Sequence, residues 1–438
     1  MSIDSSKLLL KEKNYKDAKE SLNKLSIDNP NDLRTNFLLG KLYYDLNDLR
    51  KSLFYFNKCN NLNSGNPNVL FNLALVLQST GEVNKAKDIY NQLIKINITD
   101  IKSYYGLFKL DIENINNEFY QNLLNLSSNE KISLLDKSLI NFIISKIKKK
   151  EGDIKSEIEY LNLAHEQCYN SNLNFNVQSD FYYKKIIPKY FDKICFNDEF
   201  EKLEKFNDLE HIFIIGLPRS GSSLIETIIM HNSKKVFSVG EFHGINTSIF
   251  DQISKTIYSK DFKINEYNFS LNKKKFQNRL IQKYDNFNDD RFLDKSLENF
   301  FNIEIILKFF PKAKFIHTRR NFKDSVIGIY QTMLTELSWS HNIQSIKNYI
   351  STYLKVISYY KEKYPDKIID VDLDNFFNEK ELELKKVLNF LNIDFSENYL
   401  EFEQNKNLFN KTNSFLQVRQ NIKKYENKKY LPYYFLLD

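Results

Sequence analysis

The sequence has few cysteines and no long apolar run. Its 3 cysteines, Cys59, Cys168 and Cys195, are far apart and form neither a CxxC pair nor a zinc-ligand spacing. We interpret them as buried or free thiols in a reducing compartment, and the 6 scattered histidines indicate no metal site. No stretch approaches the roughly 18 apolar residues of a membrane span, and residues 1–20 lack the apolar core of a signal peptide. We therefore expect a cytoplasmic protein.

Glycine and arginine are also scarce, so their positions are informative. Only 10 glycines occur, yet four of them lie between 216 and 244. Glycine permits positive φ and close approach of a ligand, so the cluster marks a place where the backbone itself acts. Only 8 of the 63 basic residues are arginines, and Arg219, Arg319, Arg320 and Arg419 fall in polar segments of the second half. The planar guanidinium suits phosphate or sulfate. The mild net charge of +7 argues against nucleic acid as a partner and suits a small anionic ligand.

A 34-residue period organises the first part of the chain. The repeated positions are small residues (Ala18, Ser52, Ala86), large apolar residues one turn later (Leu22, Phe56, Tyr90) and turn residues (Lys13, Asn47, Gly81). This pattern is typical of tetratricopeptide (TPR) helix–turn–helix repeats. A degenerate unit returns at 145–164, where Gly152 occupies the turn. We predict an all-α solenoid over 1–170 and a helical linker over 171–207.

The sequence pattern changes near residue 208. Short apolar runs at 211–216, 292–295, 313–320 and 367–373 are each followed by a helical pattern. Such alternation predicts an α/β domain over 208–438 with a central parallel sheet covered by helices. Ligands of such sheets bind at the carboxyl ends of the strands, so the loops that follow these runs are the candidate site.

The loop GLPRSGSS, 216–223, resembles a P-loop that lacks its lysine. Gly216 and Gly221 have the P-loop spacing, but Ser222 stands where the lysine is expected and Ser223 follows it. A glycine turn that enters a helix N-terminus forms an anion cradle. Arg219 supplies a cation from within the loop, Ser220, Ser222 and Ser223 add hydroxyl donors, and Pro218 stiffens the approach.

Other strand-end loops supply further polar candidates. Glu241 in SVGEFHG is a candidate general base, although a surface glutamate is the simpler interpretation. Lys295 in LDKS is placed to stabilise a leaving phosphate. Arg320 in HTRRNFKDS forms a second anion site at the start of a helix. The polar stretch NKTNSFLQVRQ, 410–420, brings together Ser414, Gln417 and Arg419.

Five of these segments together resemble sulfotransferases. IFIIGLPRSGSS resembles their 5′-phosphosulfate loop, TRRNFKDS their 3′-phosphate segment, and SFLQVR their late S-x-x-Q-V element. SVGE and LDKSLENF are similar to the stretches that carry the catalytic glutamate and lysine in protein-tyrosine sulfotransferases. The TPR repeats followed by this domain resemble the bacterial TPR–sulfotransferase proteins.

The resemblance implies a donor, 3′-phosphoadenosine 5′-phosphosulfate (PAPS), and in-line sulfuryl transfer without a metal. It implies that Glu241 is the base and that Lys295 and Ser414, together with Arg219, stabilise the transition state. The residues that it assigns to donor binding are Pro218, Arg219, Ser220, Gly221, Ser222, Ser223, Arg320, Gln417 and Arg419.

Gly328 departs from this pattern. The family has a serine for the 3′-phosphate eight residues after the arginine, whereas this sequence has Gly328. We expect Ser325 or Arg319 to compensate. Phe322 and Leu297 replace two prolines of the family pattern, and neither change removes the base or the lysine.

Two alternatives remain open at this point. One is a TPR adaptor whose transferase domain binds the nucleotide but is inactive, and the other is a P-loop-type phosphotransferase. For a sulfotransferase, the acceptor is a hydroxyl of a peptide or protein tyrosine, a glycan or a small molecule. The TPR groove would recruit a polypeptide, since helical solenoids bind extended chains, or would form a homodimer.

Overall fold

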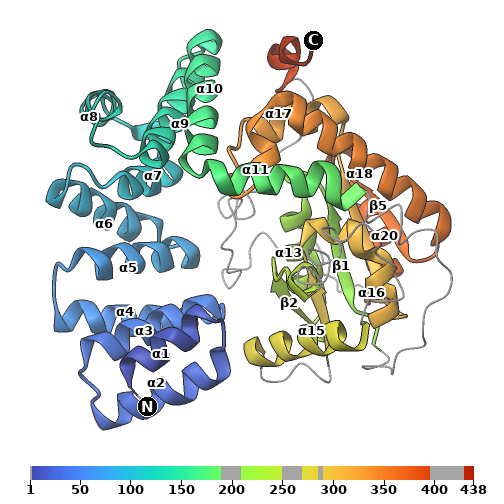
Figure 1. Ribbon diagram of the computed structural model, residues 1–438, viewed down its shortest axis with the longest axis horizontal. Coiled ribbons are helices and arrows are strands. Elements are labelled where there is room, and N and C mark those ends of the chain that lie inside the picture. The colour runs from blue at the N-terminus through green and yellow to red at the C-terminus, as the bar shows by residue number, and fades with distance from the viewer. Residues whose placement is uncertain (1, 189–208, 249–268, 285–289, 395–428) are drawn as a thin grey trace. The chain divides into compact units, whose positions relative to one another are not determined.

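The computed structural model describes residues 2–188, 209–248, 269–284, 290–394 and 429–438 (Figure 1). Contacts group these residues into two compact units, one built on the chain up to Ser171 and one on the chain from Asn172 onward. Candidate residues Cys195, Ser414, Gln417 and Arg419 lie outside the described residues.

The first unit is all-helical. Figure 1 shows its helices, coloured from blue to teal, as successive hairpins. They are α1 (Ile3–Lys11), α2 (Tyr15–Asp28), α3 (Leu33–Asp45), α4 (Leu49–Leu62), α5 (Pro67–Thr80), α6 (Val83–Ile96), α7 (Ile101–Leu110), the 3₁₀ turn η1 (Ile112–Asn114), α8 (Asn117–Ser127), α9 (Leu134–Lys150) and α10 (Ile154–Ser171). The helices α3, α5 and α7 start at 33, 67 and 101, so the predicted 34-residue period sets the helix starts and extends one hairpin further.

The predicted turn residues share one backbone conformation. Lys13, Asn47, Gly81 and Gly152 have φ of 59°, 65°, 90° and 79°. A residue in the left-handed backbone conformation, with positive φ, ends a helix because the chain there leaves the helical path. The turn position therefore repeats although three residue types occupy it.

The small residues of the repeat let neighbouring helices approach. Ala18, Ser52 and Ala86 are each 0% exposed. The Ser52 hydroxyl donates to the Gly40 carbonyl at 2.8 Å, which ties α4 to α3. A Cβ on Gly40 would lie 2.9 Å from the Phe56 ring, so the predicted large residue fills the space that glycine leaves.

The second unit alternates helices with five strands. Its elements are α11 (Leu173–Phe181), the π-helical turn η2 (Tyr182–Ile186), β1 (Ile212–Gly216), α13 (Ser222–Asn232), β2 (Val236–Gly240), α15 (Phe269–Lys283), β3 (Arg291–Asp294), η4 (Leu297–Asn302), α16 (Ile303–Phe309), β4 (Lys314–Arg319), α17 (Phe322–Tyr330), η5 (Ser338–His341), α18 (Ile343–Lys363), β5 (Ile368–Asp372), α19 (Leu373–Asn378), α20 (Lys380–Phe390) and η7 (Leu431–Leu437).

The strands form one parallel sheet in the order β2-β3-β1-β4-β5, which confirms the predicted α/β fold. Four strands coincide with the predicted apolar runs, whereas β2 was not predicted. Because all five strands are parallel, Gly216, Gly240, Asp294, Arg319 and Asp372 end at the same edge of the sheet. The candidate loops therefore start from one edge.

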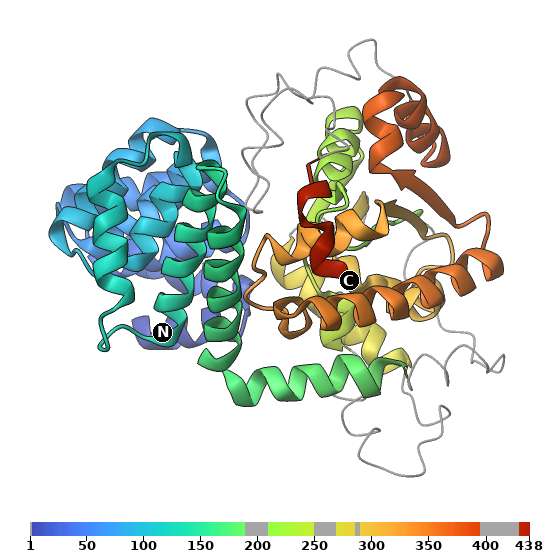
Figure 2. The same cartoon turned by 90° about the horizontal axis from the view of Figure 1, so that it is seen from above.

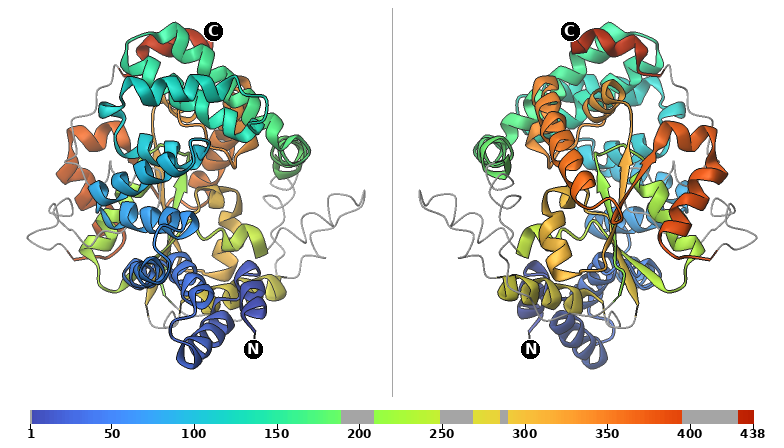
Figure 3. Two further views of the ribbon diagram at one scale, coloured as in Figure 1. Left: turned by 90° about the vertical axis from the view of Figure 1, so that its left-hand side faces the viewer. Right: turned by 90° about the vertical axis from the view of Figure 1, so that its right-hand side faces the viewer.

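Helices cover both faces of this sheet (Figure 2, Figure 3). Side chains alternate along β1, so that Ile212 and Ile214 pack in one core cluster with residues of α13, α19 and α20. Phe213 points to the opposite face, where its ring lies 5.6 Å from Phe292 and 5.5 Å from Phe315. This alternation explains why β1 is apolar throughout: it is buried on both sides.

Candidate active site

The loop between β1 and α13 is shaped by its backbone. Gly216, Arg219 and Gly221 have φ of 146°, 69° and 92°. A Cβ on Gly216 would lie 2.3 Å from the carbonyl oxygen of Thr318 on the neighbouring strand. A Cβ on Gly221 would lie 2.6 Å from Leu373 Cδ1. Both glycines are therefore required by conformation and by space.

The loop leads directly into a helix. Gly221 precedes Ser222 and Ser223, the first residues of the 11-residue helix α13. The amide groups at a helix start carry partial positive charge and attract anions. The loop and the helix start therefore have the arrangement from which the sequence predicts an anion cradle.

The serines of this loop have different surroundings. Ser220 is 3% exposed, and its hydroxyl donates to the Leu217 carbonyl at 2.6 Å. It also forms a hydrogen bond of 2.7 Å with the Thr318 hydroxyl. Ser220 thus holds the loop against β4, while Ser222 is buried at the helix start and Pro218 is partly exposed.

Lys295 and Glu241 meet where β3 and β2 end. Lys295 Nζ lies 2.7 Å from Glu241 Oε1 and 3.7 Å from Glu226 Oε2, a residue of α13. The lysine side chain is 1% exposed and the Glu241 side chain is 52% exposed. The structure thus brings together the predicted base and the predicted lysine, with one face of the base open to solvent.

The charges of Lys295, Glu241 and Glu226 shift the pKa values of Lys295 and Glu241. Burial alone would lower the pKa of Lys295, but Glu226 and Glu241 outweigh that effect and raise it. Partial burial raises the pKa of Glu241, but the charge and hydrogen bond of Lys295 dominate and lower it. Both side chains are therefore charged at neutral pH.

The turn that carries Glu241 is fastened to the end of β3. The Lys295 backbone N–H donates to the Gly240 carbonyl at 2.9 Å. The His243 N–H donates to the Ser296 hydroxyl at 2.7 Å, and the Ser296 N–H donates to Asp294 Oδ1 at 2.7 Å. The base and the lysine are consequently held on one frame.

Arg319 and Arg320 have different surroundings. The Arg319 side chain is 50% exposed, and its Nε donates to Asp372 Oδ2 at 2.9 Å on β5. The Arg320 side chain is 6% exposed, and its Nε lies 3.9 Å from Asp324 Oδ2. Arg320 Cζ stands 4.9 Å from the centroid of the Tyr430 ring. Arg320 is connected to the first loop through Tyr430, because Tyr430 Oη and Arg219 Cβ both lie within 4 Å of the Cβ position of Gly328.

Ser325 and Arg319, the two residues expected to compensate for Gly328, have other contacts. The Ser325 hydroxyl donates to the Asn321 carbonyl at 2.8 Å within its own helix, and Arg319 pairs with Asp372.

Three residues near this site were missed by sequence reasoning. Glu226 lies beside Lys295, and Ser238 donates a short hydrogen bond to Glu226. Tyr430 stacks on Arg320. Glu226 lies one helical turn after Ser222, which could have drawn attention to it, whereas no motif distinguishes Tyr430 among 27 tyrosines.

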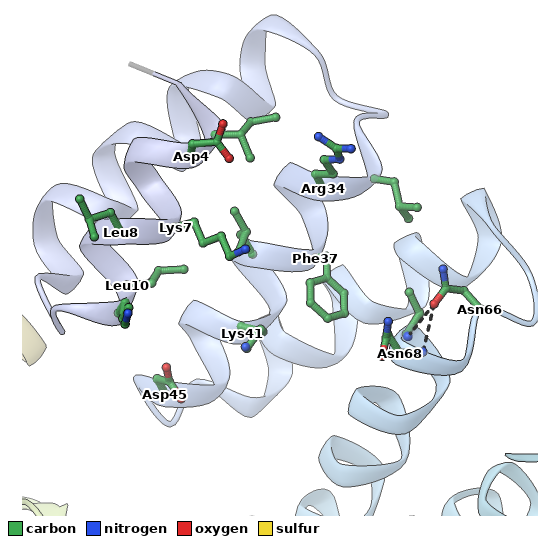
Figure 4. Close-up of a pocket in the computed structure, with 15 residues that line it drawn as sticks. Asp4, Lys7, Leu8, Leu10, Arg34, Phe37, Lys41, Asp45, Asn66 and Asn68 are labelled. Carbon is green, nitrogen blue, oxygen red and sulfur yellow. Dashed lines mark hydrogen bonds between the residues drawn. The ribbon is translucent and has the colours of Figure 1, made fainter. Parts of the chain in front are cut away.

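The first unit contains an open groove of about 1010 Å³ (Figure 4). Its lining comes from α1, α3 and the start of α5, and includes the apolar side chains of Leu8, Leu33 and Phe37. Its charged residues are Lys7, Lys11, Arg34, Lys41, Asp4 and Asp45. Four cations against two carboxylates make the groove basic.

Within the described ranges, no group of three or more His, Cys, Asp or Glu residues could hold a metal ion. In the same part of the chain, no helix is long and apolar enough to span a membrane.

Comparison with known proteins finds one curated relative. A protein of Aquifex aeolicus (strain VF5), described as uncharacterized, is 25% identical over 386 residues, which are 83% of this chain and 48% of the relative. The chain therefore spans about half the length of this relative.

Several solved sulfotransferases resemble parts of the chain. The sulfotransferase domain of the Synechococcus PCC 7002 olefin synthase matches with a TM-score of 0.35 and 18% identity, over 50% of this chain and 86% of that one. Sulfotransferase STF1 of Mycobacterium tuberculosis H37Rv matches with a TM-score of 0.32 and 11% identity, over 66% and 93%.

Two family models match the sequence itself. Residues 33–66 and 67–97 match the tetratricopeptide repeat, and residues 211–397 match the sulfotransferase family. The second match spans all five strands and the residues Arg219, Glu241, Lys295 and Arg320. The chain therefore combines tetratricopeptide repeats with a domain of the sulfotransferase family.

Proposed function

We propose that this chain transfers a sulfuryl group from PAPS to a hydroxyl group of an acceptor. The contact of 2.7 Å between Lys295 and Glu241, at the strand ends beside a glycine loop, carries the proposal. It places a cation and a base together where an anionic donor would bind, which matches the needs of sulfuryl transfer.

The two loops would hold the two ends of the donor. The backbone of 216–223, the start of α13 and Arg219 suit the 5′-phosphosulfate, because amide groups and a guanidinium both donate to anionic oxygens. Arg320, which directly follows the adjacent strand β4, suits the 3′-phosphate. Ser220 would act by holding the first loop on β4, since its hydroxyl is already bonded there.

The reaction itself needs one base and one cation. The Glu241 carboxylate accepts the proton of the acceptor hydroxyl, and the acceptor oxygen forms a bond to sulfur. The bond between sulfur and the bridging oxygen of the 5′-phosphate breaks, and adenosine 3′,5′-bisphosphate leaves with that oxygen. Lys295 stabilises the negative charge that develops on the bridging oxygen.

The resting contacts of Lys295 couple donor binding to the strength of the base. The sulfate and phosphate oxygens of the donor compete with Glu241 for the lysine. A carboxylate that loses a cationic partner and gains anionic neighbours has a higher pKa. Donor binding would therefore make Glu241 a stronger base at the step that needs it, while Glu226 keeps its contact with Ser238.

We propose a tyrosine of a polypeptide as the first acceptor class, with glycan and small-molecule hydroxyls as alternatives. The basic groove of the first unit would receive an acidic, extended segment of a protein partner. Reversal of its charge, in Lys7→Glu with Lys41→Glu, should abolish binding of an acidic peptide measured by fluorescence anisotropy. Unchanged binding would exclude this role.

Glu241→Gln tests the catalytic assignment. We expect this variant to bind adenosine 3′,5′-bisphosphate like the parent, by isothermal titration calorimetry. Transfer of radiolabelled sulfate from PAPS to a tyrosine peptide should fall on the order of 100-fold or more, the usual contribution of a general base. Glu226→Gln is the matched control and should lose less activity, because Glu226 lies farther from Lys295 Nζ. Full activity in Glu241→Gln would show that the base is wrong.

Ligand preference separates the proposal from its alternatives. A thermal shift with adenosine 3′,5′-bisphosphate, absent with ADP, supports a sulfotransferase site. Magnesium-dependent ATP turnover would instead indicate a phosphotransferase. Nucleotide binding without transfer to any acceptor would favour an inactive adaptor.

A further inference from the structure

Tyr430 lies against Arg320, which precedes α17, and against Gly328 within α17. It is 5% exposed, and it immediately precedes η7, which packs against α17 (Figure 1, Figure 2). Arg320 Cζ lies 4.9 Å from the centroid of its ring, a distance at which a guanidinium is attracted to an aromatic face. The ring thus stacks on the arginine assigned to the 3′-phosphate.

The hydroxyl of Tyr430 reaches the position that a side chain at 328 would occupy. A Cβ on Gly328 would lie 3.3 Å from Tyr430 Oη and 3.9 Å from Arg219 Cβ. A serine hydroxyl at 328 would extend from that Cβ into the space that the phenol oxygen now borders. Gly328 therefore leaves room for Tyr430 between the two arginines.

The segment that carries Tyr430 is fixed in place. The Tyr434 hydroxyl donates to Asp324 Oδ1 at 2.7 Å, and Lys323 Nζ lies 5.1 Å from the Tyr434 ring. Lys347 on α18 donates to the Leu437 carbonyl at 2.8 Å. These contacts bind η7 to α17 and α18, so the position of Tyr430 is set by the fold.

The local charge at Tyr430 suits an anion. Burial lowers the pKa of Arg219; the neighbouring Tyr430 opposes this effect, and the charge of Arg320 lowers the pKa further. An anion bound beside Arg320 would relieve this repulsion, because it offsets the charge of Arg320 that Arg219 experiences.

We propose that the Tyr430 hydroxyl is a ligand of the 3′-phosphate of the nucleotide and replaces the hydroxyl that Gly328 lacks. This inference rests on the proposed function, and it explains how Gly328 is compatible with donor binding. Tyr430 is a binding residue, contributed by a segment more than 100 positions after Arg320 in the sequence.

Tyr430→Phe tests the proposal, because it keeps the ring on Arg320 and removes only the hydroxyl. We expect affinity for adenosine 3′,5′-bisphosphate, measured by calorimetry, to fall on the order of 10-fold, as for a lost hydrogen bond to a charged group. Affinity for adenosine 5′-phosphosulfate, which has no 3′-phosphate, should not change. Thermal unfolding of the variant checks that it is folded.

Gly328→Ser in the Tyr430→Phe background provides the decisive comparison. A hydroxyl returned at 328 should restore affinity for the bisphosphate, which a purely structural role of Tyr430 would not predict. If Tyr430→Phe binds the bisphosphate as well as the parent, or more tightly, the proposal is overturned while the proposed function stands. If the parent itself does not prefer the bisphosphate to adenosine 5′-phosphate, both fall.

Discussion

Two loops at the same sheet edge, 216–223 after β1 and 319–325 after β4, differ in what would form the anion site proposed for each. The first is defined by its backbone, with φ of 146° at Gly216 and 92° at Gly221. The second is defined by side chains, Arg320 and a tyrosine from a distant segment. Glycine is visible in a sequence that has only 10 of them, whereas a contact between distant side chains is not. A sequence can therefore indicate a site that depends on glycine backbone, but not one that depends on a contact between side chains far apart in the chain.

The largest expected effect is a loss of stability caused by a substitution in the loop 216–223. Gly216→Ala would force a Cβ to within 2.3 Å of the Thr318 carbonyl oxygen at φ 146°. Left-handed backbone costs about 1–3 kcal/mol and overpacking about 1–3 kcal/mol more, so we expect the free energy of unfolding to fall by about 2–6 kcal/mol. Urea denaturation followed by circular dichroism measures it.

Gly240→Ala is the matched control for this experiment. Gly240 has φ 62°, but nothing lies within 4 Å of its added Cβ. It should show only the conformational part of the loss. Equal losses in the two variants would mean that the close approach to β4 is unimportant.

An intermediate effect is expected at the side-chain loop. Arg320→Ala should weaken binding of adenosine 3′,5′-bisphosphate by about 10–100-fold, because it removes a charged hydrogen-bond donor. Arg319→Ala, at the adjacent position, should leave this affinity nearly unchanged, since Arg319 pairs with Asp372. Calorimetry on both variants decides the assignment, and a larger loss in Arg319→Ala would reverse it.

The smallest effect concerns the link between the two loops. The hydrogen bond of 2.7 Å between Ser220 and Thr318 joins the first loop to the strand that carries the second. Ser220→Ala and Thr318→Val should each reduce stability by about 1 kcal/mol. The double variant should lose less than the sum, because both changes remove the same bond. Strict additivity would show that the two hydroxyls act independently.

Much of the fold could be predicted because its signals are local. The turn residues Lys13, Asn47 and Gly81 keep the 34-residue register, and the strands β1, β3, β4 and β5 are apolar runs. Strand β2 was missed because it is an outermost strand of the sheet. Of its five residues, only Val236 and Val239 are buried. Its serine and glycine do not form the continuous apolar run by which the inner strands were predicted.

The site was predictable to the same extent. Glu241 and Lys295 follow strand ends, and sheet topology brings strand ends together. Glu226 was missed because a glutamate in a helix gives no sign that it faces a lysine 69 positions later. Arg319 contacts Asp372 on β5, whereas Arg320 contacts Tyr430 next to η7. Two adjacent arginines in a sequence give no indication of this difference.

The register of the strands has a consequence for the missing P-loop lysine. Asp294, the end of β3, pairs with Phe213, whereas Thr318 of β4 pairs with Gly216, three residues further along β1. Gly240 of β2 pairs with Asp294, so β2 and β3 end at the same level. At roughly 3.3 Å per residue, these two strands end about 10 Å short of the ends of β1 and β4. Glu241 and Lys295 follow β2 and β3, which end at the lower level. The loops 216–223 and 319–325 follow β1 and β4, which end at the upper level. A P-loop lysine at 222 would start from the same level as the loop amides. In the proposed complex, Lys295 would approach from the lower level, so that the loop backbone would hold the donor while the cation reaches its reacting end from a separate direction.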